Sequence, residues 1–82
     1  MEVLAEVTGV KEPWMETLAV DVLTFISGES ADKVRKSGDK MFIRFSALEE
    51  YYNEAMATGL WENYAKRRLM NGMKLNIKVL GG

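Results

Sequence analysis

Catalysis by this chain would depend on Asp, Glu, Lys or Tyr, because its 82 residues include no histidine and no cysteine. Those two residue types supply most general bases, thiol nucleophiles and zinc ligands, so these mechanisms are excluded together. The acidic residues are scattered, and the adjacent Glu49 and Glu50 fall in an expected helix, where sequence neighbours point in different directions. The sequence contains no metal-ligand spacing and no glycine-rich phosphate loop. We therefore expect a protein that is not an enzyme and that uses no metal or cofactor.

Basic residues indicate a second kind of chemistry, the binding of nucleic acid. Segments 40–45 and 74–80 alternate apolar and polar residues, so their basic side chains and Phe42 are expected to share one outward sheet face. A basic face that carries an aromatic side chain can bind single-stranded nucleic acid. The alternative is a solvated face, on which acidic residues of an N-terminal strand form ion pairs with these cations.

Segment 47–70 resembles part of a helix-turn-helix motif. Ala55, Gly59 and Leu60 stand where such motifs have a small residue, the turn glycine and the next apolar residue. The resemblance implies that the second helix reads DNA. The alternative is an ordinary helical hairpin that is broken at Gly59. Together, the helix and the strands give these nucleic-acid-binding candidates: Arg44, Asn63, Lys66, Arg67, Arg68, Lys74 and Lys78.

The chain ends in Gly81-Gly82 after an alternating segment. This end resembles the tail of ubiquitin-like proteins and sulfur carriers. The resemblance implies that the carboxylate of Gly82 is adenylated and then joined to a thiol or an amine. The alternative is a chain end with no special role.

Large apolar residues are more numerous than one small core needs. Six methionines and eight aromatic residues occur in the chain, and both types are enriched at protein interfaces. The protein-binding candidates are Trp14, Leu23, Phe25 and Phe42. Trp14 follows Pro13 in an expected loop, which makes it the best single anchor for a partner.

Four segments are predicted as strands: 2–8, 16–26, 40–45 and 74–80. In the first segment Val3, Ala5 and Val7 alternate with polar residues, which is typical of a half-buried strand. Segment 16–26 is ambiguous because its apolar residues also fit a helix. Its β-branched residues favour a strand, and a helix would place Asp21 on the apolar stripe.

Two helices are predicted at 47–57 and 60–70. Ser46 and Glu49 have the spacing of a capping box, and an apolar stripe follows them. Gly59 separates the two helical patterns. Residues 27–39 are polar and flanked by glycines, so we expect a long loop with a helical turn near Ser30.

These elements predict one small α+β domain over residues 1–82, with two layers: a mostly antiparallel sheet and a helical hairpin on one face. Residues 1–30 carry a net charge of −5, and residues 61–82 carry +4. We expect the two ends to neutralise each other side by side in the sheet. No apolar run is long enough to span a membrane and the N-terminus does not resemble a signal peptide, so we expect a cytoplasmic protein.

The sequence therefore favours a non-catalytic protein-binding module, such as a small inhibitor, an adaptor or a subunit of an assembly. Its partner would be another protein or a second copy of the chain. Small proteins encoded by phages or mobile elements have this size, and such an origin is one interpretation. Nucleic-acid binding through the basic second helix and C-terminal strand, and a carrier role through Gly82, are the alternatives.

Overall fold

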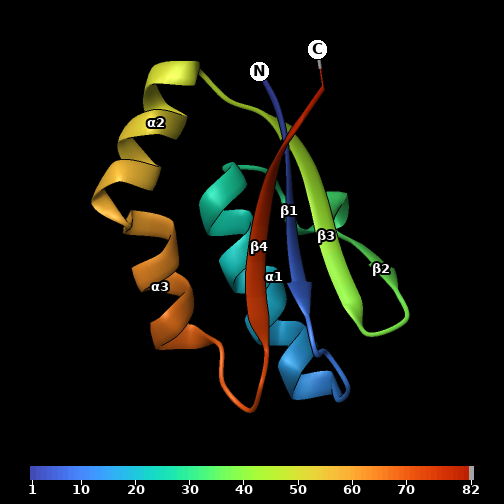
Figure 1. Ribbon diagram of the computed structural model, residues 1–82. Helices are drawn as coiled ribbons and strands as arrows, with labels where there is room; N and C mark the ends of the chain where they lie inside the picture. The colour runs from blue at the N-terminus through green and yellow to red at the C-terminus, as the bar shows by residue number, and fades with distance from the viewer. Residues whose placement is uncertain (82) are drawn as a thin grey trace.

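Four antiparallel strands form one sheet in the order β2-β3-β1-β4 (Figure 1). The computed structural model describes residues 1–81. Its strands are β1 (Glu2–Thr8), β2 (Arg35–Ser37), β3 (Lys40–Ser46) and β4 (Lys74–Leu80). Its helices are α1 (Pro13–Ser27), α2 (Glu49–Thr58) and α3 (Leu60–Arg68), with a short 3-10 helix at Ala31–Lys33.

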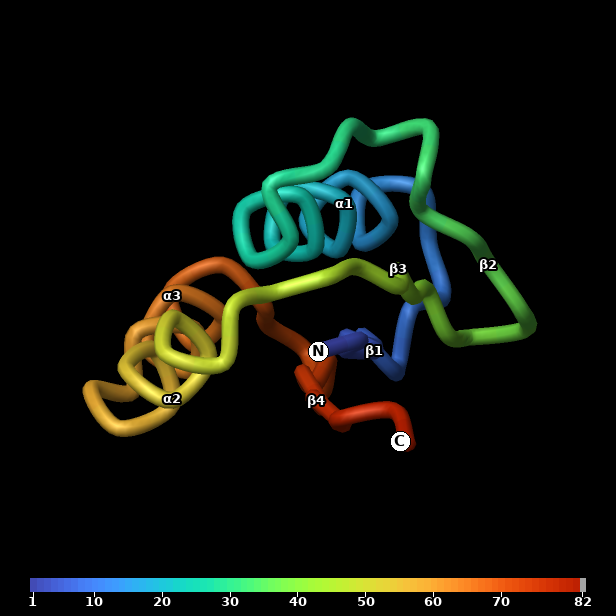
Figure 2. The backbone as a smooth tube through the Cα atoms, turned by 90° about the horizontal axis from the view of Figure 1, so that it is seen from above, coloured from blue at the N-terminus to red at the C-terminus, as the bar shows by residue number. Residues whose placement is uncertain are grey.

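The helices lie on one face of the sheet and leave the other face open (Figure 2). Helix α1 packs on β1 and β3, whereas α2 and α3 lie toward the β4 side of the sheet. With α2 and α3 taken as one helical unit, the element order is the β-α-β-β-α-β order of ferredoxin-like domains. The predicted two-layer α+β class is confirmed. Many unrelated functions use this architecture, so the fold alone does not identify the function.

The core forms where the central strand β1 meets the helices. Val3, Ala5 and Val7 of β1 are completely buried, and their partners in β3 are Phe45, Ile43 and Met41. Both alternations were predicted correctly from the sequence. β1 pairs antiparallel with β3 on one side and with β4 on the other, so its backbone groups have hydrogen-bond partners along both edges.

The open face carries the polar side chains of the same strands. Arg44 of β3 lies 3.8 Å from Glu2, and Lys78 of β4 lies 3.4 Å from Glu6. The acidic N-terminal strand is thus hydrogen-bonded directly to the basic C-terminal strand. The expectation that the two charged ends lie side by side is confirmed.

The predicted strand at 16–26 is wrong, because this segment belongs to helix α1. Pro13 occupies the start of the helix, where a missing N–H costs nothing, and Gly28 ends the helix in the left-handed region with a φ of 71°. The buried residues recur with helical spacing, which outweighs the strand propensity of β-branched residues: Met15, Ala19, Val22, Leu23 and Ile26. Asp21, the residue that argued against a helix, lies at the border of this apolar face.

Residues 27–39 contain more structure than a loop. The expected helical turn is present as the 3-10 helix after Ser30, but β2 then pairs with β3 at the far edge of the sheet. The predicted capping box at Ser46 is wrong, since Leu48 precedes the first residue of α2 and no side chain caps it. Ser46 instead pairs with Glu2 in the sheet, and Ala47 exchanges hydrogen bonds with Met1.

The expected helical hairpin is a kinked rod. Gly59 alone joins α2 to α3, with a φ of 69°, and α3 begins at once with a hydrogen bond from Asn63 N–H to the Gly59 carbonyl. One residue can change the direction of a helix but cannot reverse it, and Figure 1 shows α3 continuing the descent of α2. A helix-turn-helix motif needs a turn of three to four residues, so the resemblance does not extend to the geometry.

Trp61 fastens this kinked rod to the core. Its side chain is only 1% exposed and makes an edge contact with Phe45 of β3, at 6.1 Å between ring centroids. It also contacts Tyr51 and Tyr52 of α2, at 5.9 and 5.8 Å, and so joins the two halves of the rod. The indole N–H has no hydrogen-bond partner within the described part of the chain. The contribution of Trp61 itself therefore comes from aromatic packing and not from a polar contact.

We expect Trp61→Ala to lower the free energy of unfolding by about 3–5 kcal/mol, because it leaves a large cavity under α3. That loss approaches the total stability of roughly 4–12 kcal/mol expected for a domain of this length. Urea unfolding followed by circular dichroism measures the change. Trp14→Phe is the control, because Trp14 is exposed, and we expect a change within about 0.5 kcal/mol. Equal losses in the two variants would contradict the assignment of Trp61 as the anchor.

Candidate functional site

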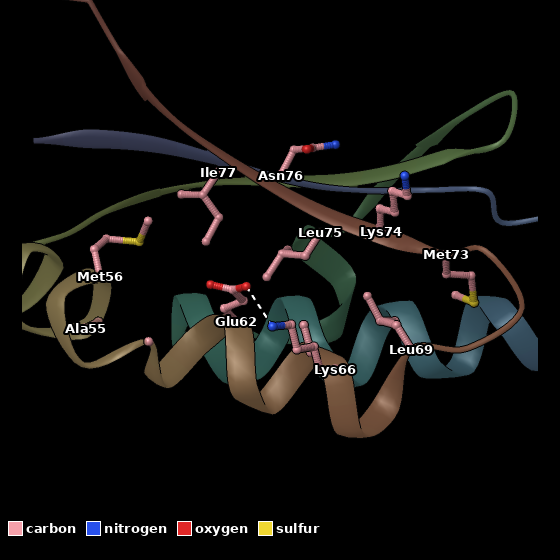
Figure 3. A pocket seen from close by; sticks show the side chains of 12 residues that line it. Ala55, Met56, Glu62, Lys66, Leu69, Met73, Lys74, Leu75, Asn76 and Ile77 are labelled. Carbon is pink, nitrogen blue, oxygen red and sulfur yellow. Dashed lines mark ion pairs between the residues drawn. The ribbon is translucent and has the colours of Figure 1, made fainter.

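A groove with a volume of about 530 Å³ lies between β4 and the rod formed by α2 and α3 (Figure 3). Its walls are mainly apolar and come from both helices, from the turn before β4 and from β4 itself. The apolar lining residues are Ala55, Met56, Ala65, Leu69, Met73, Leu75 and Ile77. A second, smaller hollow of about 380 Å³ lies between α1 and Met41 of β3.

The groove follows the edge of a strand that has only one neighbour. β4 is the last strand of the sheet and pairs with β1 alone. Consecutive residues 73–77 line the groove, so it extends along the strand edge as well as over one face. In Figure 3 Leu75 and Ile77 point toward α3, whereas Lys74 and Asn76 point away from it. The backbone groups on this edge have no strand partner in the described chain.

A pair of charged residues forms the polar rim of the groove. The Lys66 ammonium lies 2.9 Å from the Glu62 carboxylate, one turn apart on α3. Both side chains are largely exposed, so this ion pair stays hydrated at the rim while the apolar walls lie below it. An apolar interior with a polar rim is the usual anatomy of a protein-binding surface.

A cluster between α1 and α3 holds the helical wall of the groove in place. The Tyr64 hydroxyl donates a hydrogen bond of 2.9 Å to Asp21, and the Arg68 guanidinium lies 3.6 Å from the same carboxylate. The ring of Phe25 stacks on Tyr64 with 3.8 Å between centroids, and the Arg68 guanidinium lies over the Tyr64 ring, 5.2 Å from its centroid. Asp21 thus accepts contacts from two residues of α3, which explains its place at the border of the apolar face of α1.

The environment of Tyr64 changes its acidity. Partial burial raises the pKa of the Tyr64 hydroxyl above its usual value of 10.0, and the hydrogen bond to Asp21 raises that pKa further. Both effects favour the neutral phenol, which can donate to the carboxylate. The nearby Arg68 opposes them only in part.

The structure separates the four protein-binding candidates. Trp14 lies exposed near the start of α1, where its indole N–H donates to Glu12 at 2.7 Å. Phe25 is near the other end of α1 and is partly covered by Tyr64, and Phe42 lies on the opposite, open face of the sheet. Leu23 is 0% exposed, so its assignment to a binding surface is wrong. That assignment assumed a strand with two buried faces, whereas α1 turns Leu23 into the core.

The nucleic-acid-binding candidates fall on two separate surfaces. Arg44, Lys74 and Lys78 share the open sheet face, and the other four residues lie on α3. Four of the six cations have a carboxylate within ion-pair distance: Arg44, Lys66, Arg68 and Lys78. In the described chain, Lys74 and Arg67 have no such partner, and Asn63 is exposed. The carrier-tail candidate Gly82 lies outside the described residues.

The sequence interpretation missed the groove residues. Leu75 and Ile77 were expected on the inner face of a strand, which is correct, but their place at a free edge depends on the strand order. The sequence signal that could have pointed to the groove is its methionine content, since Met56 and Met73 are both lining residues. The pattern of α2 and α3 gave no indication that the rod extends beyond the sheet.

Comparisons with protein-family models, with curated proteins and with solved structures find no match to this chain. Within residues 1–81, no three acidic side chains lie close enough together to hold a metal ion. None of the helices in the same range has the length and the apolar character needed to cross a membrane.

We expect Tyr64→Phe to lower the free energy of unfolding by about 1 kcal/mol at neutral pH, through loss of the hydrogen bond to Asp21. Because the folded-state pKa is raised, the contribution of Tyr64 is complete below pH 10 and disappears as the pH rises through the folded-state pKa. The stability difference between wild type and variant should therefore shrink above pH 10. Urea unfolding of both proteins between pH 8 and pH 11 measures it, and a constant difference would contradict the role of the phenol.

Proposed function

We propose that this protein is a non-catalytic protein-binding module whose recognition surface is the groove between β4 and the α2–α3 rod. The observation that carries this proposal is an apolar groove of about 530 Å³ along a strand edge that no other strand within residues 1–81 pairs with. A segment of another polypeptide fits such a groove, because it offers apolar side chains for the walls and backbone groups for the edge.

The exposure of individual side chains supports this proposal. Val79 lies two residues beyond Ile77, the last residue of β4 that lines the groove; it pairs with Val3, so its side chain lies on the helical side of the sheet, yet it is 50% exposed. Met56 of α2 is 47% exposed where it lines the groove. Removing apolar surface from water contributes about 25 cal/mol per Å², so a partner that covers these side chains gains affinity from them.

The groove also suggests how the module acts. Its rim residues Glu62 and Lys66 neutralise each other, and the apolar walls offer no group for acid–base catalysis. An inhibitor or adaptor that works in the cytoplasm by binding a segment of its partner needs affinity for that segment and no catalytic group. The methionines in the walls can adjust their shape to that segment.

Two matched substitutions test the groove. Met56 and Leu48 are both exposed apolar residues at α2, but only Met56 lines the groove. Peptides are first selected from a random library on the immobilised 82-residue chain, and their sites are mapped by NMR chemical shifts. We expect Met56→Glu to weaken binding about tenfold or more, because the carboxylate loses hydration inside the apolar groove. Leu48→Glu should leave the affinity unchanged.

Two results would contradict this proposal. The first is a library that yields no binder to the folded protein. The second is a set of binders whose chemical-shift changes map to Trp14 on α1 or to Phe42 on the open face and that are insensitive to Met56→Glu. Circular dichroism of each variant confirms that the fold is intact before affinities are compared.

A further inference from the structure

The two edges of the sheet differ in length and in character. β2 at one edge has three residues, all of them exposed, and two of these are Arg35 and Lys36. Short, charged edge strands resist pairing with other chains. β4 at the other edge has seven residues and presents Leu75 and Ile77 to the groove. The sheet therefore has one protected edge and one edge that is suited to a further strand.

The helical layer is wider than the sheet at this second edge. Figures 1 and 2 show the α2–α3 rod on the helical side and displaced outward past β4. A strand added to β4 would lie about 4.8 Å farther out, beneath this rod. Its inward side chains would enter the groove, where small residues such as Ala55 and Gly59 leave space. The dimensions of the groove thus fit an extended segment.

The charges of β4 define the other face of that segment. Lys74 and Lys78 lie on the open face of the sheet. On the side of β4 that pairs with β1, Glu6 lies opposite Asn76 and therefore between the two lysines. Glu6 reaches Lys78 at 3.4 Å, whereas Lys74 has no ion pair in the described chain. A carboxylate opposite Asn76 on the free side would stand between the same two lysines. Cross-strand neighbours of opposite charge stabilise a sheet.

A second copy of the chain does not meet this requirement. β4 contains no acidic residue, so no pairing of two β4 strands offers Lys74 or Lys78 a carboxylate. Antiparallel pairing centred on Asn76 would place Lys74 of one copy opposite Lys78 of the other. Like charges directly opposite each other destabilise the pair.

We infer that the groove takes an extended, acidic segment of another protein, which adds to β4 as a fifth strand. Its apolar residues alternate with acidic ones: the apolar side chains enter the groove, and the carboxylates face Lys74 and Lys78. This inference rests on the proposed function and names the chemistry of the partner. Backbone hydrogen bonds to β4 provide affinity, and the alternating side chains provide specificity.

The test uses the 82-residue chain and a seven-residue peptide that alternates valine with glutamate. We expect this peptide to bind and to slow amide hydrogen exchange along β4, because the free edge gains partners. Two N-methylated forms of the peptide distinguish binding by strand addition from binding that depends only on the amino-acid composition of the peptide. N-methylation of the amides that face β4 should abolish binding, whereas methylation of the alternate set should not, since successive amides of a strand point to opposite edges.

Charge reversal tests the acidic preference. We expect a peptide that alternates valine with lysine to bind more weakly. Lys74→Glu should lower the affinity for the acidic peptide about fivefold and raise the affinity for the basic peptide. Lys40→Glu is the matched control, because Lys40 is exposed on β3 near the β2 edge and should leave both affinities unchanged. Equal affinity for the two peptides would overturn the acidic part of the inference.

Two further outcomes would overturn strand addition itself. Binding of an amphipathic helical peptide in the groove, with no binding of the alternating peptides, would leave the proposed protein-binding function intact and refute the strand. Slower β4 exchange with rising protein concentration and no peptide would identify a second copy as the occupant. If neither these peptides nor the random library yields binding, both the inference and the proposed function fail.

Discussion

The groove exists because the α2–α3 rod is held to the core at points away from β4. Trp61 packs against Phe45 of β3, and Tyr64 with Arg68 binds Asp21 of α1. Helix α3 contacts β4 less extensively than it contacts α1. These attachments fix the distance between the rod and the sheet edge, so the width of the groove is a property of the folded core.

This arrangement also explains the uneven burial of the strands. β1 lies between two neighbours under α1, and its inward side chains are completely buried. β4 has the same alternation, yet Val79 remains half exposed because the rod stands off from it. A difference in cover, rather than in sequence pattern, thus separates a core strand from a strand that contributes to a binding surface.

The strand alternations and the one-sided helical layer could be predicted from the sequence, because each depends on local periodicity. The sequence misassigns segment 16–26 because a helix places Asp21 at its apolar face, and the partners that accommodate Asp21 there, Tyr64 and Arg68, are more than forty residues away in the chain. The prediction of a helical hairpin is wrong because the angle between α2 and α3 at Gly59 depends on the contacts that Trp61 makes in the core. Strand order, and with it the free edge of β4, follows from long-range packing that no local pattern records.

A long free strand edge is a hazard for a small domain, because another chain can pair with it and begin aggregation. Natural sheets often place lysines on such edges to prevent this pairing, and β4 carries Lys74 and Lys78. The same two lysines that oppose pairing between identical copies would attract a strand that carries carboxylates. Selectivity against self and attraction to an acidic partner therefore require the same charges, and neither requires a polar group inside the apolar groove. An edge kept free for recognition needs this protection more than an edge that is covered.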